Sequence, residues 1–191
     1  DLYELAADCS PKNISDKIAE NRPDKVVAVG GDGTIKLVAE QLLKAIIPLG
    51  IIPAGSANGM AKELGIATDI NKALDIILNG EIKKIHIIRI NSEICIHLSD
   101  IGFNAFVVKK FETAPKRGMW EYIKAGWKVL KLNPLLSLTL ELDDKTIKRK
   151  AAMVVIANAT KYGTGIMINP EGSLEDALFE VIVVRKFSLK E

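Results

Sequence analysis

The sequence predicts an α/β domain with a parallel sheet, followed by a mostly antiparallel β-rich domain. In the first eighty-odd residues, short β-branched runs alternate with amphipathic helical segments, which is typical of parallel sheets. Farther along the chain, apolar and polar residues alternate with a period of two between turn residues, which is typical of hairpins. The length of 191 residues is enough for two small domains. We therefore predict domains over residues 1–84 and 85–191.

The elements of the first domain follow from caps, turns and apolar runs. Ser10 can cap a helix that has Pro11 at its first position and ends near Asn21. Two short apolar runs, residues 25–29 and 49–52, predict buried strands. Helices are predicted after each of these strands and after the potential cap Asp69, over residues 34–45, 57–64 and 70–79.

The second domain is predicted from alternating runs and the turns between them. One amphipathic helix, over residues 118–131, interrupts the strands and carries Trp120 and Trp127 at helical spacing. Strands are predicted over residues 82–90, 94–98, 135–142, 146–157 and 178–184.

Composition excludes several classes of function. The 26 basic and 24 acidic residues give a net charge of +2, which argues against a nucleic-acid-binding protein. Charged residues interrupt every apolar run before it reaches membrane-spanning length. Cys9 and Cys95 are far apart, and residues 1–5 lack the pattern of a signal peptide, so we expect a reducing, cytoplasmic location.

The first chemical motif is a glycine-rich turn directly after the strand at residues 25–29. It reads Gly30-Gly31-Asp32-Gly33-Thr34 and leads into a helix. Glycines let the backbone approach an anion, and the free N–H groups at a helix start can bind phosphate. Asp32 would repel phosphate unless a cation such as Mg²⁺ bridges the two. The turn therefore predicts a nucleotide site for phosphoryl transfer; the alternative is a purely structural turn in which Asp32 caps a helix.

The second motif, Pro53-Ala54-Gly55-Ser56-Ala57-Asn58, follows the next predicted strand. Because ligands bind at the carboxyl ends of parallel strands, we expect both turns to face the same site. The alternative is an ordinary strand-to-helix loop with Ser56 as the helix cap. His86 and His97 lie in predicted strands with no ligand or catalytic partner at a suitable spacing, so we interpret both as packed or surface side chains.

Over about residues 20–185, the chain resembles the diacylglycerol kinase catalytic domain family, which includes bacterial lipid kinases, sphingosine kinases and ceramide kinases. The pair of turns is the most specific part of this resemblance. Weaker motifs follow in the same order, namely Gly102-Phe103 with Ala105, Ala157-Asn158, Pro170, and Leu174-Glu175-Asp176-Ala177-Leu178.

The resemblance implies an ATP- and Mg²⁺-dependent kinase that acts on a lipid hydroxyl. It implies a first domain similar to those of NAD kinases and phosphofructokinases, and a second domain that is a β-sandwich. The family's nucleotide-binding positions match Gly30, Gly31, Asp32, Gly33, Thr34, Gly55, Ser56 and Asn58, with Asp32 as the catalytic candidate. A structural metal site of bacterial members matches Asp176 and the carbonyls of Ser173 and Leu178.

The chain departs from the family pattern at four places. It has Lys36-Leu37 where Asn-Glu is common, Gly59 where Asp often follows the second motif, and Ala177 where glycine is usual. The N-P-x-S-G and D-G-E segments, the latter with the proposed general base, are not among its 191 residues. If these departures disable catalysis, the chain is a lipid- or nucleotide-binding module. An NAD kinase, which has the same Gly-Gly-Asp-Gly turn, is a second alternative.

The expected partners are a lipid substrate and, transiently, a membrane surface, with a homodimer as a further possibility. Apolar side chains such as Phe103, Phe106 and Val107 would line the lipid pocket. The two tryptophans of the segment 118–131 either pack on the β-rich domain or, with neighbouring basic residues, contact an anionic membrane. Those basic residues are Lys116, Arg117, Lys124, Lys128 and Lys131.

Overall fold

The computed structural model describes residues 1–6, 9–103, 135–163 and 165–186. The chain forms two compact units, and each contains two separate stretches of sequence. The first unit contains residues 1–97 and 159–177, and the second contains residues 98–158 and 178–191. The sequence prediction assigned residues 85–97 and 159–177 to the second domain, whereas their contacts place them in the first unit.

A parallel pair of strands forms the centre of the first unit. β1 (Val26–Gly30) pairs with β2 (Leu49–Pro53), with Val26 opposite Leu49 and Gly30 opposite Pro53. The two strands therefore end level with each other. Ala28 and Ile51 lie opposite each other and are buried, as the apolar runs predict.

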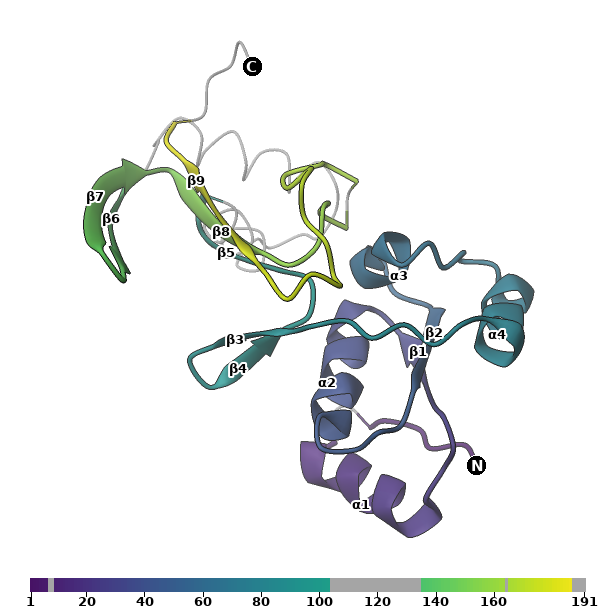
Figure 1. The fold of residues 1–191 in the computed structure, drawn as a ribbon. Helices are drawn as coiled ribbons and strands as arrows, with labels where there is room; N and C mark the ends of the chain where they lie inside the picture. The colour runs from purple at the N-terminus through teal and green to yellow at the C-terminus, as the bar shows by residue number, and fades with distance from the viewer. Residues whose placement is uncertain (7–8, 104–134, 164, 187–191) are drawn as a thin grey trace, which may run out of the picture. The chain divides into compact units, whose positions relative to one another are not determined.

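The described part of the first unit contains four helices. α2 contacts β1 and α4 contacts β2, and Figure 1 shows these two helices on opposite sides of the pair. The apolar face of α2 is buried through Ile35, Val38 and Leu42. The predicted cap of α4 is confirmed, because the Asp69 carboxylate accepts a hydrogen bond from the Lys72 N–H at 2.9 Å. The helices are α1 (Pro11–Asn21), α2 (Asp32–Leu42), α3 (Gly59–Glu63) and α4 (Ile70–Asn79).

The first unit also contains a short hairpin, formed by β3 (Ile88–Ile90) and β4 (Glu93–Cys95). The prediction of one strand over residues 82–90 is wrong for residues 82–87. These residues run alongside a later part of the same unit: the His86 N–H donates to the Leu174 carbonyl, and His86 Nδ1 accepts from the Ala177 N–H at 3.1 Å. The backbone of His86 therefore pairs with distant chain rather than with a neighbouring strand.

The second unit contains an antiparallel sheet in the order β5-β8-β9 and a separate hairpin, β6-β7. The prediction of one strand over residues 146–157 is corrected, because the strand is interrupted at Ala152. That residue donates its N–H to the Val184 carbonyl and accepts from the Phe103 N–H. The strands are β5 (Leu98–Gly102), β6 (Leu136–Leu142), β7 (Lys145–Ala151), β8 (Met153–Ala157) and β9 (Glu180–Val184).

Two sequence predictions concern parts of the chain outside the described residues. The helix over residues 118–131, with its tryptophans and basic residues, lies there, as do Phe106 and Val107. Among the helices of the described ranges, none has the length and hydropathy needed to cross a bilayer.

Candidate functional site

The two glycine-rich turns lie side by side because β1 and β2 are parallel and in register. Gly30 is opposite Pro53, and the Ala54 N–H donates to the Gly30 carbonyl at 2.9 Å. This hydrogen bond continues the strand pairing into the turns. The structure therefore brings the two motifs together at the carboxyl ends of the strands, the edge where α/β sheets bind ligands.

Glycine at both turns is required by their close approach. A Cβ atom on Gly31 would lie 3.2 Å from the Cα of Gly55, and a Cβ on Gly55 would overlap the Cα of Gly31. A Cβ on Gly30 would lie 2.6 Å from Thr34 Oγ1. In contrast, a Cβ on Gly33 would meet nothing within 4 Å, so this glycine has open space beside it. Close packing explains why Gly30, Gly31 and Gly55 are glycines. The backbone of Gly33 is not crowded and is accessible to a ligand.

Asp32 connects the first turn to the helix that follows the second turn. Its Oδ2 accepts from the Gly59 N–H and its Oδ1 accepts from the Met60 N–H, both at 2.9 Å. Asp32 is the first residue of α2, but it accepts from the first two N–H groups of α3, which have no partner within that helix. Asp32 therefore does cap a helix, but the capped helix is α3 and not α2, the helix that Asp32 begins.

Asn58 holds the second turn in a compact shape. Its Oδ1 accepts from the Gly55 N–H, and its Nδ2 donates to the Gly55 carbonyl, both at 2.8 Å. Asn58 is only 6% exposed, and its backbone has the left-handed conformation, with φ 52°. Asn58, not Ser56, is the residue that precedes α3, so the alternative of Ser56 as a helix cap is wrong. The Ser56 residue is exposed beside the turn.

A return segment, residues 159–163, packs along α3 within the first unit. The Glu63 carboxylate accepts from the Thr160 N–H at 3.0 Å and from the Thr160 hydroxyl at 2.9 Å. Lys62 Nζ donates to the Gly163 carbonyl at 2.6 Å. The helix is thus held by Asp32 at its start and by the return segment at its end. Sequence reasoning did not find Glu63 or Thr160, because neither belongs to a motif.

His97 packs against the start of α3. A Cβ on Gly59 would lie 2.7 Å from His97 Cε1 and 3.2 Å from the Cα of Gly163, so position 59 has no room for a side chain. This crowding explains the departure at Gly59. Burial lowers the pKa of His97, and the nearby carboxylates of Asp32 and Glu63 oppose that shift. The interpretation of His97 as a packed side chain agrees with this position.

The predicted metal site near Asp176 stays a prediction. Ser173 and Asp176 belong to the first unit and Leu178 to the second, and Ser173 Oγ accepts from the Glu175 N–H at 3.1 Å. Within the described ranges, no three His, Cys, Asp or Glu side chains form a group that could hold a metal ion. The predicted site would use one carboxylate and two backbone carbonyls, so it does not belong to the class of sites with three such side chains.

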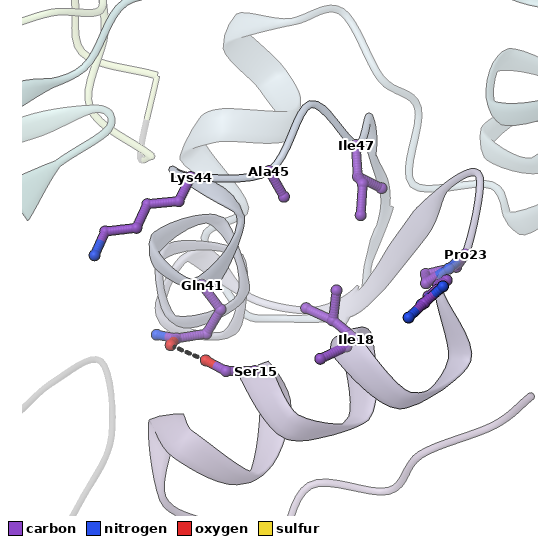
Figure 2. Close-up of a pocket in the computed structure, with 9 residues that line it drawn as sticks. Ser15, Ile18, Pro23, Gln41, Lys44, Ala45 and Ile47 are labelled. Atoms are coloured by element: carbon purple, nitrogen blue, oxygen red, sulfur yellow. Dashed lines mark hydrogen bonds between the residues drawn. The ribbon is translucent and has the colours of Figure 1, made fainter.

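A hollow of about 530 Å³ lies elsewhere in the first unit, between α1 and the end of α2. Figure 2 shows the Ser15–Gln41 hydrogen bond at its edge, and Lys44 directed away from it. Pro23, before β1, lines the hollow, whereas the glycine-rich turns follow the opposite ends of the strands. The hollow is therefore not part of the site at the turns.

Comparison with known proteins identifies both parts of the chain. Residues 1–90 match the model of the diacylglycerol kinase catalytic domain. This part of the chain is therefore similar to the catalytic domains of diacylglycerol kinases. Residues 99–191 match the YegS C-terminal NAD kinase beta sandwich-like domain. The predicted resemblance is confirmed, and the described turns lie within the catalytic-domain match.

Several curated proteins are similar to this chain. A diacylglycerol kinase of Staphylococcus saprophyticus is 30% identical over 178 residues, which are 90% of this chain and 58% of that protein. An uncharacterized protein of Synechocystis is 35% identical over 162 residues, which are 83% of this chain and 37% of that protein. The chain thus spans about half the length of these relatives, or less.

A solved structure supports the fold. The crystal structure of a diacylglycerol kinase from Bacillus anthracis has a TM-score of 0.71 and 22% identity, covering 96% of this chain and 61% of that chain. At this identity the likeness concerns the fold alone. The predicted fold class is confirmed: an α/β part with a parallel sheet, followed by an antiparallel, β-sandwich-like part.

Proposed function

We propose that this protein is a lipid kinase that transfers the γ-phosphate of ATP to a lipid hydroxyl. The observation that supports this most is the packing of two glycine-rich turns, Gly31 against Gly55, inside a catalytic domain of the diacylglycerol kinase family. Phosphoryl transfer needs phosphates held in place, their charge neutralised and an acceptor placed in line. The turns supply the first of these requirements.

In this proposal, backbone N–H groups of the first turn bind the phosphates. Gly31, Gly33 and Thr34 surround the start of α2, where free N–H groups and the helix dipole favour an anion. The open space beside Gly33 lets a phosphate approach the backbone closely. Ser56 is exposed on the second turn, which adjoins the first, and would line the same nucleotide site.

The residues at the first turn fit Mg²⁺. Each Asp32 oxygen accepts one backbone N–H and keeps a second lone pair, and Mg²⁺ is commonly held by one or two carboxylates together with phosphates. When bound, the ion would neutralise charge on the phosphates. Asp32 would then have two roles, because the same carboxylate fixes the second turn through α3.

The lipid class rests on the relatives. The similar proteins of Staphylococcus saprophyticus and Bacillus subtilis bear the name diacylglycerol kinase, at 30% identity each, which favours a diacylglycerol-like substrate over a sphingosine-like one. These names also make an NAD kinase the weaker alternative. The proposal has three further parts. The lipid is bound from a membrane surface, a structural metal is bound at Asp176, and the protein forms a homodimer.

The test is a phosphate-transfer assay on the longest form of the protein in which this chain occurs. Diacylglycerol, sphingosine and NAD are offered separately with labelled ATP and Mg²⁺. We expect label in the diacylglycerol product and none in NAD. Label in NAD alone would replace the proposal with an NAD kinase. ATP binding without transfer to any acceptor would favour the impaired binding module.

A further inference from the structure

The helix α3 is too short to hold its own position. It has five residues, and an isolated helix of that length is not stable in water. Its first two N–H groups are nevertheless the donors that Asp32 accepts, and it directly follows the second turn. The place of the second turn therefore depends on the contacts that fix α3 from outside.

The return segment supplies such contacts. The Thr160 hydroxyl lies 2.9 Å from both oxygens of Glu63, and the Thr160 N–H lies 3.0 Å from one of them. The part-buried carboxylate thus accepts from both hydrogen-bond donors of a single residue. Hydrogen bonds to a charged partner are stronger than those between neutral groups. This pair fixes the end of α3.

The same segment also touches the second turn directly. A Cβ on Gly163 would lie 2.8 Å from the Cβ of Ala57, and the Cα of Gly163 borders the space beside Gly59. Lys62, the neighbour of Glu63, donates to the Gly163 carbonyl. The return segment therefore contacts the second turn and both polar residues at the end of α3.

We propose that Glu63 and Thr160 are positioning residues for the nucleotide, and that the return segment is a third structural element of the nucleotide site. This inference rests on the proposed function. The pair touches no reacting atom in this scheme. It acts through α3, which holds the second turn and the donors to Asp32 in the geometry that receives the phosphates.

The test compares Thr160→Val with Thr160→Ser in the longest form of the protein. Valine keeps the shape but removes the hydroxyl, whereas serine keeps the hydroxyl. We expect Thr160→Val to raise the Kd and KM for ATP about tenfold, with an unchanged KM for the lipid. Thr160→Ser should restore ATP binding to within about threefold of the wild type. The matched control is Thr139→Val on the exposed face of β6, with an unchanged Kd.

Equal ATP affinity in a folded Thr160→Val variant and in a wild type that binds ATP would overturn this inference alone. A wild type that does not bind ATP would overturn the proposed function and this inference with it. If Thr160→Val does not fold, Glu63→Gln decides, because glutamine keeps an acceptor but loses the charge. It should weaken ATP binding about fivefold, and unchanged binding there would likewise overturn the inference.

Discussion

The two glycine-rich turns both follow a strand of the parallel pair, but different contacts fix their conformations. The first turn lies between a five-residue strand and an eleven-residue helix that buries three apolar side chains. The second turn leads into a helix of only five residues. Its shape depends on Asn58, on Asp32 of the first turn, and on the return segment through Glu63.

This difference shows that neighbouring loops of one site can have different sources of stability. The first turn is fixed by elements on either side of it in the sequence. The second is fixed by Asn58 within the motif and also by residues that are distant in sequence, so substitutions far from the motif should disturb it. Four predictions test this contrast, beginning with the largest expected effect.

Asp32→Ala should have the largest effect, because it removes the connection between the first turn and α3. Two α3 N–H groups would lose their acceptor, which costs about 1–3 kcal/mol of the free energy of unfolding for each group that stays unsatisfied. Turnover should fall at least about a hundredfold. Kinase assays and denaturant unfolding measure the two quantities.

The matched control is Asp69→Ala, which removes the cap of α4, where the carboxylate accepts from the Lys72 N–H. It should lower the free energy of unfolding by about 1 kcal/mol and leave turnover unchanged. Normal turnover in Asp32→Ala would contradict the assignment of Asp32 to the site.

Gly55→Ala should separate the two turns. Its new Cβ would overlap the Cα of Gly31, and such overpacking typically costs about 1–3 kcal/mol of stability. Gly33→Ala is the informative counterpart. A Cβ there meets nothing within 4 Å, so stability should hold or rise, while the methyl group obstructs a phosphate.

Thermal unfolding and ATP titration of both variants distinguish these effects. We expect Gly55→Ala to lose stability and ATP affinity together, and Gly33→Ala to lose ATP affinity only. If Gly33→Ala binds ATP as tightly as the wild type does, the backbone of the first turn does not contact the phosphates.

His97 should make the stability of the first unit depend on pH. Burial lowers the folded-state pKa of His97 below its ordinary value of 6.5. The unfolded state therefore binds more protons below that pH, and the free energy of unfolding falls as the pH decreases below 6.5.

His97→Gln should flatten this part of the profile. Thermal melts between about pH 5 and 7.5, compared between wild type and variant, isolate this histidine from the carboxylates that titrate lower. Identical slopes would mean that the imidazole beside Gly59 is not the group responsible.

Glu93→Gln should have the smallest effect. Glu93 accepts from Lys36 Nζ at 2.7 Å, a contact between α2 and β4 that is distant in sequence. The ammonium of Lys36 lowers the pKa of Glu93, but both side chains are exposed, and such pairs contribute about 0–1 kcal/mol.

We expect turnover to stay unchanged, because the first turn does not need this contact. Chemical denaturation at low and high salt measures the pair. A large loss of activity would break the contrast, since the first turn would then depend on distant contacts as the second does.

The sequence by itself determined most elements of the first unit and the order of the motifs. α1 begins at Pro11 and Asp69 caps α4, as the sequence predicts, although Ser10 makes no side-chain cap hydrogen bond to α1. The two glycine-rich turns lie at the ends of β1 and β2. The parallel alternation also predicted that the turns are neighbours. These features follow from local backbone preferences and from hydrophobic periodicity, and both are determined by residues close together in the sequence.

Only the tertiary structure decided which groups the site residues meet. Nothing local indicates that Asp32 caps α3, that Glu63 pairs with Thr160, or that His97 fills the space beside Gly59. Residues 82–87 likewise alternate as a strand should, yet His86 pairs with the backbone of Leu174. These contacts join residues far apart in the chain, and their existence depends on how whole elements pack, which no short-range pattern encodes.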